Sequence, residues 1–175
     1  MNLEFCKCKK EDITNLIPLI NSAYRGEKTA NTWTNESHLF NGVRVDNEKI
    51  VNIFNEPNSI IYLAKLENRI IACIQAKLEA NGIHIGLFAV DTNLQSGGVG
   101  KRLLEFAENS SSKIYNKADR FVMEVISTRA ELIAYYNRRG YISTNKYIDF
   151  PKSELVNQSL KEEIKFLILE KKINK

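Results

Sequence analysis

Apolar residues recur along this chain with the two periods that distinguish strands from amphipathic helices. Residues 3–8 alternate as a half-buried strand does, whereas residues 13–20 carry apolar side chains three and four positions apart, as a helix does. The same reasoning predicts further helices at residues 46–55, 99–115 and 128–138, and further strands at residues 59–66, 69–78, 83–90, 120–126, 141–150 and 162–169. Residues 171–175 are expected to fray.

Turn and cap signals mark several boundaries between these elements. Asn81-Gly82 is a strong turn signal, so the three strands from residue 59 to residue 90 are expected to form an antiparallel meander. Thr128 followed by Glu131 has the form of a capping box, which assigns Glu131 a structural role at the start of a helix.

The periodic pattern breaks between residues 24 and 42. A short helix is expected only around residues 34–40. Because irregular segments between regular elements often carry binding residues, this stretch is a candidate substrate lid.

Length and composition indicate one globular domain, residues 1–175. The chain is 43% hydrophobic and 26% charged, and it has no run of about 20 apolar residues. Its first residues lack the basic-then-apolar order of a secretory signal, so a soluble cytoplasmic protein with no membrane association is expected. The net charge of +4 comes from scattered Lys and Arg, which does not favour nucleic-acid binding.

The cysteines do not indicate a disulfide framework or a metal site. Cys6, Cys8 and Cys73 are three in number and irregularly spaced, whereas a structural zinc site needs four ligands. All three lie in predicted strands, so buried free thiols are expected, with no metal.

A glycine-rich loop lies between the strand predicted at residues 83–90 and the helix predicted at residues 99–115. Gln95, Gly98 and Gly100 have the spacing Gln-x-x-Gly-x-Gly. Glycines allow a tight turn and a close ligand approach, and the helix N-terminus presents free N–H groups to an anion. The loop is therefore a candidate pyrophosphate cradle.

Three kinds of phosphate ligand fit such a loop unequally. A nucleoside-triphosphate loop ends in Gly-Lys-Ser/Thr, whereas here Gly100-Lys101 is followed by Arg102. A dinucleotide fold places its glycines after the first strand of a parallel sheet, whereas this loop follows a predicted antiparallel meander. Coenzyme A has a pyrophosphate and needs no metal, so it fits best.

Two motifs resemble those of the GCN5-related N-acetyltransferase (GNAT) family. Residues 85–90 followed by residues 95–100 are similar to the family's acetyl-CoA motif, Gln/Arg-x-x-Gly-x-Gly/Ala after a strand. Residues 134–141, Ala-Tyr-Tyr-Asn-Arg-Arg-Gly-Tyr, are similar to its second motif, a Tyr on a helix that ends in Gly-aromatic. The resemblance is specific from residue 83 to residue 141. It implies a single-domain α/β (α+β) fold with a central mixed, mostly antiparallel twisted sheet flanked by helices.

The resemblance also implies acetyl-CoA as co-substrate. Arg129 stands where many family members carry an Asn that contacts the cofactor. The residues expected to bind the cofactor are Phe88, Ala89, Val90, Gln95, Ser96, Gly97, Gly98, Val99, Gly100, Lys101 and Arg129.

In this family an amine attacks the acetyl thioester directly, and three tasks then need residues. A backbone N–H near Phe88–Val90, where a bulge splays the strands, would bind the oxyanion. Tyr136 matches the family's general acid, although a core aromatic is the plainer interpretation of the same residue. Glu124 is the preferred base for the amine, with His84 and Glu79 as alternatives.

The irregular segment usually forms one wall of the acceptor site in this family. Tyr24, Arg25, Trp33 and Glu36 are therefore the candidate substrate-binding residues, although a Trp anchoring a loop and solvated charges explain them equally well. The expected function is N-acetylation of a small-molecule or peptide primary amine. A non-catalytic coenzyme-A-binding sensor is the alternative, and a homodimer through the late strands is left open.

Overall fold

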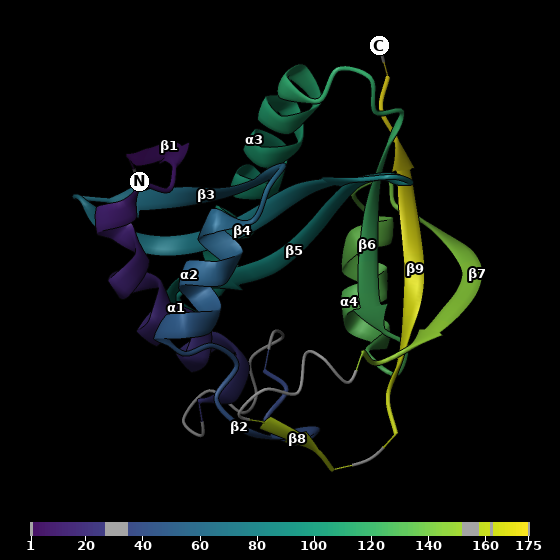
Figure 1. The fold of residues 1–175 in the computed structure, drawn as a ribbon, viewed down its shortest axis with the longest axis horizontal. Helices are drawn as coiled ribbons and strands as arrows, with labels where there is room; N and C mark the ends of the chain where they lie inside the picture. The colour runs from purple at the N-terminus through teal and green to yellow at the C-terminus, as the bar shows by residue number, and fades with distance from the viewer. Residues whose placement is uncertain (1, 27–34, 152–157, 162, 175) are drawn as a thin grey trace.

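The computed structural model describes residues 2–26, 35–151, 158–161 and 163–174 (Figure 1). The helices are α1 (Ile13–Arg25), α2 (Asn47–Asn55), α3 (Val99–Ile114) and α4 (Ala130–Asn137). The strands are β1 (Leu3–Lys7), β2 (Phe40–Gly42), β3 (Ser59–Leu66), β4 (Arg69–Glu79), β5 (Gly82–Val90), β6 (Arg120–Ile126), β7 (Ile142–Asp149), β8 (Gln158–Leu160) and β9 (Lys165–Lys172). Within these ranges no helix has the length and apolar character needed to cross a membrane.

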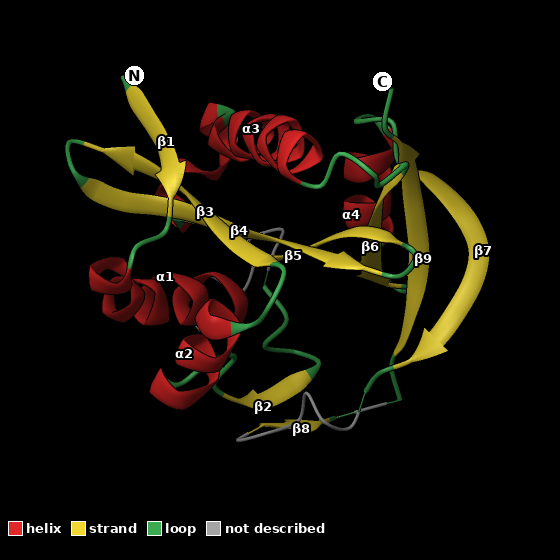
Figure 2. Cartoon of the chain, turned by 45° about the horizontal axis from the view of Figure 1, so that its top comes forward, coloured by secondary structure: helices red, strands yellow, loops and turns green. Residues whose placement is uncertain are grey.

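A seven-stranded mixed sheet in the order β1-β3-β4-β5-β6-β9-β7 forms the centre of the fold. Figure 2 shows α3 on one face of this sheet and α1 and α2 on the other. Apolar residues of α3 and α4 pack in one core cluster, and those of α1 and α2 pack in a second. The central strands are therefore buried on both faces, and the expected fold class is confirmed.

The predicted meander is confirmed, since β3, β4 and β5 pair antiparallel in sequence order. Beyond it the sheet opens. β5 and β6 run parallel and pair only at Ile83–Phe121 and His84–Val122, after which they diverge. On its other side, β5 loses register with β4 between Cys73 and Gln75. A strand that bulges against one neighbour and diverges from the other creates space within a sheet, and that space positions the site.

Three local predictions are wrong. No helix forms in the described part of residues 34–40, because residues 37–39 make a turn closed by bonds from the N–H groups of Leu39 and Phe40 to the Glu36 carbonyl. The capping box is absent, since Arg129 is the N-cap of α4 without a side-chain cap and the Glu131 carboxylate pairs with its guanidinium instead. Residues 171 and 172 are not frayed but belong to β9.

The chain's last strands also differ from the prediction. β9 begins three residues later than expected and lies between β6 and β7, so in the described seven-stranded sheet β7, and not β9, is the late strand with a free edge. Strands β2 and β8 were not predicted; they pair with each other across more than 110 residues, and three residues are too few to show a period.

Candidate functional site

A cavity of about 360 Å³ lies where β5 and β6 diverge. Its wall combines residues from α1, from the turn after residue 35, from β4, β5 and β6, and from α4. Eight residues predicted from the sequence line it together: Tyr24, Arg25, Glu36, Glu79, His84, Phe88, Glu124 and Tyr136. They are separated by up to 112 positions in the sequence, so the sheet topology alone brings them into one wall.

The centre of this wall is a bulge at Leu87 and Phe88. Neither residue has a register partner on β4 or β6, and Leu87 has a positive φ of 46°. The Leu87 carbonyl accepts a hydrogen bond from the Cys73 thiol at 3.6 Å, and the Phe88 carbonyl accepts one from the Tyr24 hydroxyl at 3.0 Å. A bulge was expected near Phe88–Val90, and it begins one residue earlier.

Tyr136 presents a phenol to the cavity from α4. Its side chain is 9% exposed, and its ring packs edge-on against Tyr135 and Tyr141, with centroids 5.2 and 6.0 Å away. Among the described residues its hydroxyl has no hydrogen-bond partner. Burial raises the pKa of this phenol well above 10, so it keeps its proton throughout the neutral range.

Glu124 extends from β6 towards His84 on β5. Glu124 Oε1 lies 3.9 Å from His84 Nδ1, while His84 Nε2 lies 2.7 Å from Asn81 Oδ1 and 3.5 Å from Glu79 Oε2. If Nε2 donates to Asn81, the lone pair of Nδ1 faces Glu124 and the cavity. All three candidate bases therefore form one cluster on the cavity wall.

The glycine loop has the features that a pyrophosphate cradle requires. Gly98 is the N-cap of α3 in the left-handed region (φ 75°), and no side chain caps that helix end. The first N–H groups of a helix have no intrahelical acceptor, so they are available to an anion. A Cβ placed on Gly97 or Gly98 would meet nothing within 4 Å, which leaves open space beside these N–H groups. These residues fit coenzyme A.

Other loop residues have packing roles as well. A Cβ on Gly100 would lie 3.3–3.4 Å from Tyr135, Phe88 and Val90, so this glycine lets α3 approach β5 closely. Gln95 donates to the Val90 carbonyl at 3.4 Å, which ties the loop to the end of β5. Ala89 and Val99 are buried. Lys101 is exposed and lies beside Glu105. The side chain of Ser96 is outside the described part of the chain.

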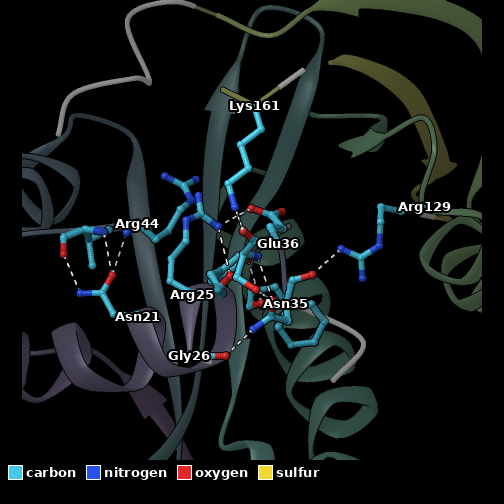
Figure 3. Close-up of polar contacts among 12 residues, drawn as sticks. Asn21, Arg25, Gly26, Asn35, Glu36, Arg44, Arg129 and Lys161 are labelled. Carbon is cyan, nitrogen blue, oxygen red and sulfur yellow. Dashed lines mark hydrogen bonds and ion pairs between the residues drawn. The ribbon is translucent and has the colours of Figure 1, made fainter. Parts of the chain in front are cut away.

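Arg129 is buried away from the lining of the cavity. Its Nη1 donates to the Asn35 carbonyl at 2.8 Å (Figure 3). Its Nε donates to Glu131. Burial by itself raises the pKa of the Glu131 carboxyl, but the hydrogen bond and charge of Arg129 hold that pKa below its usual value. These contacts fix the segment after residue 34 against α4, and the predicted contact of Arg129 with the cofactor stays a prediction.

Arg25 and Glu36 form a buried ion pair in the wall opposite β6. Arg25 Nη1 and Glu36 Oε2 are 2.9 Å apart, and the two side chains are 7% and 14% exposed (Figure 3). The Arg25 guanidinium also stacks over the Phe40 ring at 4.4 Å. Burial lowers the pKa of Arg25, opposed by its partner Glu36. Trp33, the fourth predicted substrate residue, lies outside the described residues.

Sequence reasoning missed several residues of the cavity wall. Gln75 and Lys77 follow Cys73 at every second position of β4, and this polar alternation on one face could have revealed them. Glu56 receives hydrogen bonds from both, at 3.1 and 2.7 Å, but nothing around it in the sequence marks it as a site residue. Arg44, whose guanidinium lies 5.6 Å from the centre of the Tyr24 ring, has no sequence signal either.

The described residues hold no group of three or more His, Cys, Asp or Glu side chains that could bind a metal ion.

No curated protein matches the sequence.

Solved structures share the fold at low sequence identity. The ribosomal-protein-S18-alanine N-acetyltransferase from Escherichia coli aligns with 99% of this chain and 96% of its own, with a TM-score of 0.72 and 12% identity. The PaiA N-acetyltransferase from Thermoplasma acidophilum, in complex with coenzyme A, aligns over 99% and 100% (TM-score 0.66, 20% identity). An N-acetyltransferase from Staphylococcus aureus Mu50 aligns over 98% of both chains (TM-score 0.73, 14% identity).

The sequence itself matches the profile of the acetyltransferase (GNAT) domain over residues 22–166, which is most of its length. The glycine loop at an uncapped helix end, the bulge of β5 against β4 and the divergence of β5 from β6 agree with that match. The chain therefore belongs to the GNAT family and is an acetyl-CoA-dependent N-acetyltransferase.

Proposed function

We propose that this protein transfers the acetyl group of acetyl-CoA directly to a primary amine, in a complex that holds both substrates at once. The observation that carries the proposal is that one cavity combines the Leu87–Phe88 bulge, the Tyr136 phenol and the Glu124–His84 pair. These supply an oxyanion donor, an acid and a base, which are the three groups that the reaction needs.

The reaction begins when the amine nitrogen attacks the thioester carbonyl carbon. The carbonyl oxygen becomes an oxyanion, which a backbone N–H of the bulge would stabilise. The carbon–sulfur bond then breaks, the sulfur takes the proton of Tyr136, and the amine proton passes to Glu124 or His84. The α3 N-terminus and Gly97–Gly98 would hold the pyrophosphate.

Proton transfer from Tyr136 to the thiolate is uphill by about 1.5 pKa units with ordinary values, or roughly 2 kcal/mol. Burial raises the pKa of this phenol and so makes it a weaker acid. The same burial disfavours a thiolate beside it, so both partners shift in the same direction. The two rises therefore partly cancel in the free-energy cost of the proton transfer.

The acceptor arrives mostly as an ammonium ion. With a pKa of about 10.4, only roughly one amine in a few thousand is the free base at pH 7. Glu124 on the cavity wall favours the approach of that cation, and the cluster around His84 can take its proton. A primary amine, small or at the end of a peptide, therefore suits this wall.

Coenzyme A thiol release from acetyl-CoA, measured against a panel of amines, tests the proposal. Tyr136→Phe should lower kcat by about 10²–10⁴-fold, because the ring stays and only the proton is lost. Tyr62→Phe is the matched control, since Tyr62 is fully buried on β3 and its hydroxyl has no partner in the described structure.

Glu124→Gln should change the pH–rate profile if Glu124 is the base. A profile that is unchanged by Glu124→Gln would remove this residue from the mechanism. Unchanged turnover in Tyr136→Phe would exclude Tyr136 as the acid. Tight coenzyme A binding without thiol release for any amine would instead favour a non-catalytic sensor.

A further inference from the structure

We propose that Tyr24 is a positioning residue whose hydroxyl fixes the bulge, so that the Phe88 N–H is directed into the cavity as the oxyanion donor. This inference rests on the proposed function and deepens it. It starts from the hydrogen bond that Tyr24, on α1, donates to the Phe88 carbonyl on β5 at 3.0 Å.

The geometry of the peptide plane decides which N–H faces the cavity. A trans peptide holds its C=O and N–H in opposite directions. The Leu87 carbonyl is directed to Cys73 on β4, where it accepts from the thiol at 3.6 Å. The N–H of Phe88 belongs to the same peptide plane, so it points away from the Cys73 thiol, which is not among the residues that line the cavity, whereas Leu87 and Phe88 are.

The bulge needs anchors because the ladders do not hold it. Leu87 and Phe88 have no register partner on either neighbouring strand, and Leu87 adopts a positive φ of 46° that a residue with a side chain rarely takes. Such a conformation persists only where its surroundings hold it. Side chains hold both bulge carbonyls here, with Cys73 fixing the peptide before Phe88 and Tyr24 fixing the peptide after it.

Tyr24 is suited to act as a permanent donor. Burial raises the pKa of its phenol well above the usual value, so the hydroxyl stays protonated at neutral pH. Its ring lies under the Arg44 guanidinium, with 5.6 Å between that group and the ring centre, and the helix carrying it packs on β5. Because the hydroxyl is committed to the Phe88 carbonyl, Tyr24 acts through the backbone rather than as a proton donor to the substrate.

Infrared spectroscopy of the bound thioester tests this inference without knowledge of the amine. The carbonyl stretch of [1-¹³C]acetyl-CoA should fall in frequency when the wild-type protein binds it, because the Phe88 N–H polarises the bond. In Tyr24→Phe the ring stays and the hydroxyl is lost, so the frequency should return towards its solution value. kcat should fall by about 10–100-fold, less than the loss of a whole oxyanion donor, while coenzyme A affinity is unchanged.

Two further variants separate positioning from a general loss of structure. Tyr62→Phe removes a fully buried hydroxyl elsewhere in the sheet and should match the wild type in frequency and kcat. Cys73→Ala removes the other anchor and should move both readouts in the same direction as Tyr24→Phe, which keeps the inference testable if Tyr24→Phe does not fold.

The outcomes distinguish this inference from the proposed function. If Tyr24→Phe and Cys73→Ala both retain the frequency shift and the turnover of the wild type, the positioning role alone is overturned. No frequency shift and no turnover in the wild type would overturn the proposed function, and the positioning role with it.

Discussion

Replacing Glu36 by Gln removes one charge from the buried ion pair in the cavity wall and should lower the free energy of unfolding by about 2 kcal/mol. Arg25 Nη1 and Glu36 Oε2 lie 2.9 Å apart, with the side chains 7% and 14% exposed. Gln has nearly the same shape as Glu, so the substitution tests the charge rather than the packing.

The magnitude follows from what Arg25 loses and keeps. Unit charges about 4 Å apart attract by about 4 kcal/mol at an effective dielectric constant of 20. Removing one partner of a buried pair typically costs about 3–5 kcal/mol, because the other charge stays buried. Here the introduced glutamine side chain can still accept a hydrogen bond, and Arg25 keeps its bond to the Tyr24 carbonyl and its stacking over Phe40. We therefore expect a loss below that range.

Urea unfolding at pH 7, followed by circular dichroism, measures this loss. Glu105→Gln is the matched control, because Glu105 pairs with Lys101 at 3.8 Å with both side chains more than half exposed. Exposed pairs on a helix contribute about 0.3–0.5 kcal/mol, so this control should change stability little. A loss in Glu36→Gln no greater than that in Glu105→Gln would refute the reasoning that burial makes the pair important.

Two other predictions concern the cavity and the pH dependence of stability. Gly86 lines the cavity, and a Cβ there would meet nothing within 4 Å. Gly86→Ala should therefore leave the thermal midpoint of unfolding unchanged, but its methyl group should raise KM for the amine roughly tenfold in steady-state kinetics. An unchanged KM would mean that the acceptor does not pass over Gly86. Burial alone would raise the pKa of Asp12, but hydrogen bonds from Lys65 Nζ (2.8 Å) and the Lys9 N–H (2.9 Å) hold it below its usual value. The Asp12 carboxylate therefore stabilises the fold fully above about pH 4, and this contribution is lost as the pH falls through the lowered pKa. The difference in unfolding free energy between the wild type and Asp12→Asn should accordingly shrink from pH 6 to pH 2.5, and a constant difference would contradict the assignment.

Turn residues and apolar spacing in the sequence predicted most helices and strands, because each of these patterns lies within a few neighbouring residues. The meander from β3 to β5 follows from β-branched runs joined at tight turns, and Glu67, Asn68 and Gly82 adopt the positive φ values that such turns require. The α3 helix follows from its apolar spacing and from the glycine loop before it. In the described part of residues 34–40, a turn closed on the Glu36 carbonyl replaced the expected helix. At Thr128–Glu131 the intervening Arg129, which is held by a distant partner, replaced the local pattern.

Arg129 illustrates how a distant partner changes a local prediction. Thr128 and Glu131 have the residue types of a capping box, but the Glu131 carboxylate pairs with Arg129, whose other nitrogen reaches the Asn35 carbonyl. That contact spans 94 residues and has no counterpart in the local sequence. Similarly, β9 keeps residues 171–172 ordered because β6 pairs with them, and Lys171 binds the buried Glu108 carboxylate at 2.6 Å.

The sequence by itself determined the family motifs, the glycine loop before α3 and the candidate acid Tyr136, because each is carried by residues close together in the chain. The tertiary structure alone decided that Tyr24, Glu124 and Tyr136 line one cavity, that β5 bulges at Leu87–Phe88, and that Tyr24 bonds to the Phe88 carbonyl. These features depend on the bulge of β5 against β4 and on the point where β5 diverges from β6. Strand divergence is a property of the assembled sheet, because it depends on which strands pair and on where their pairing stops.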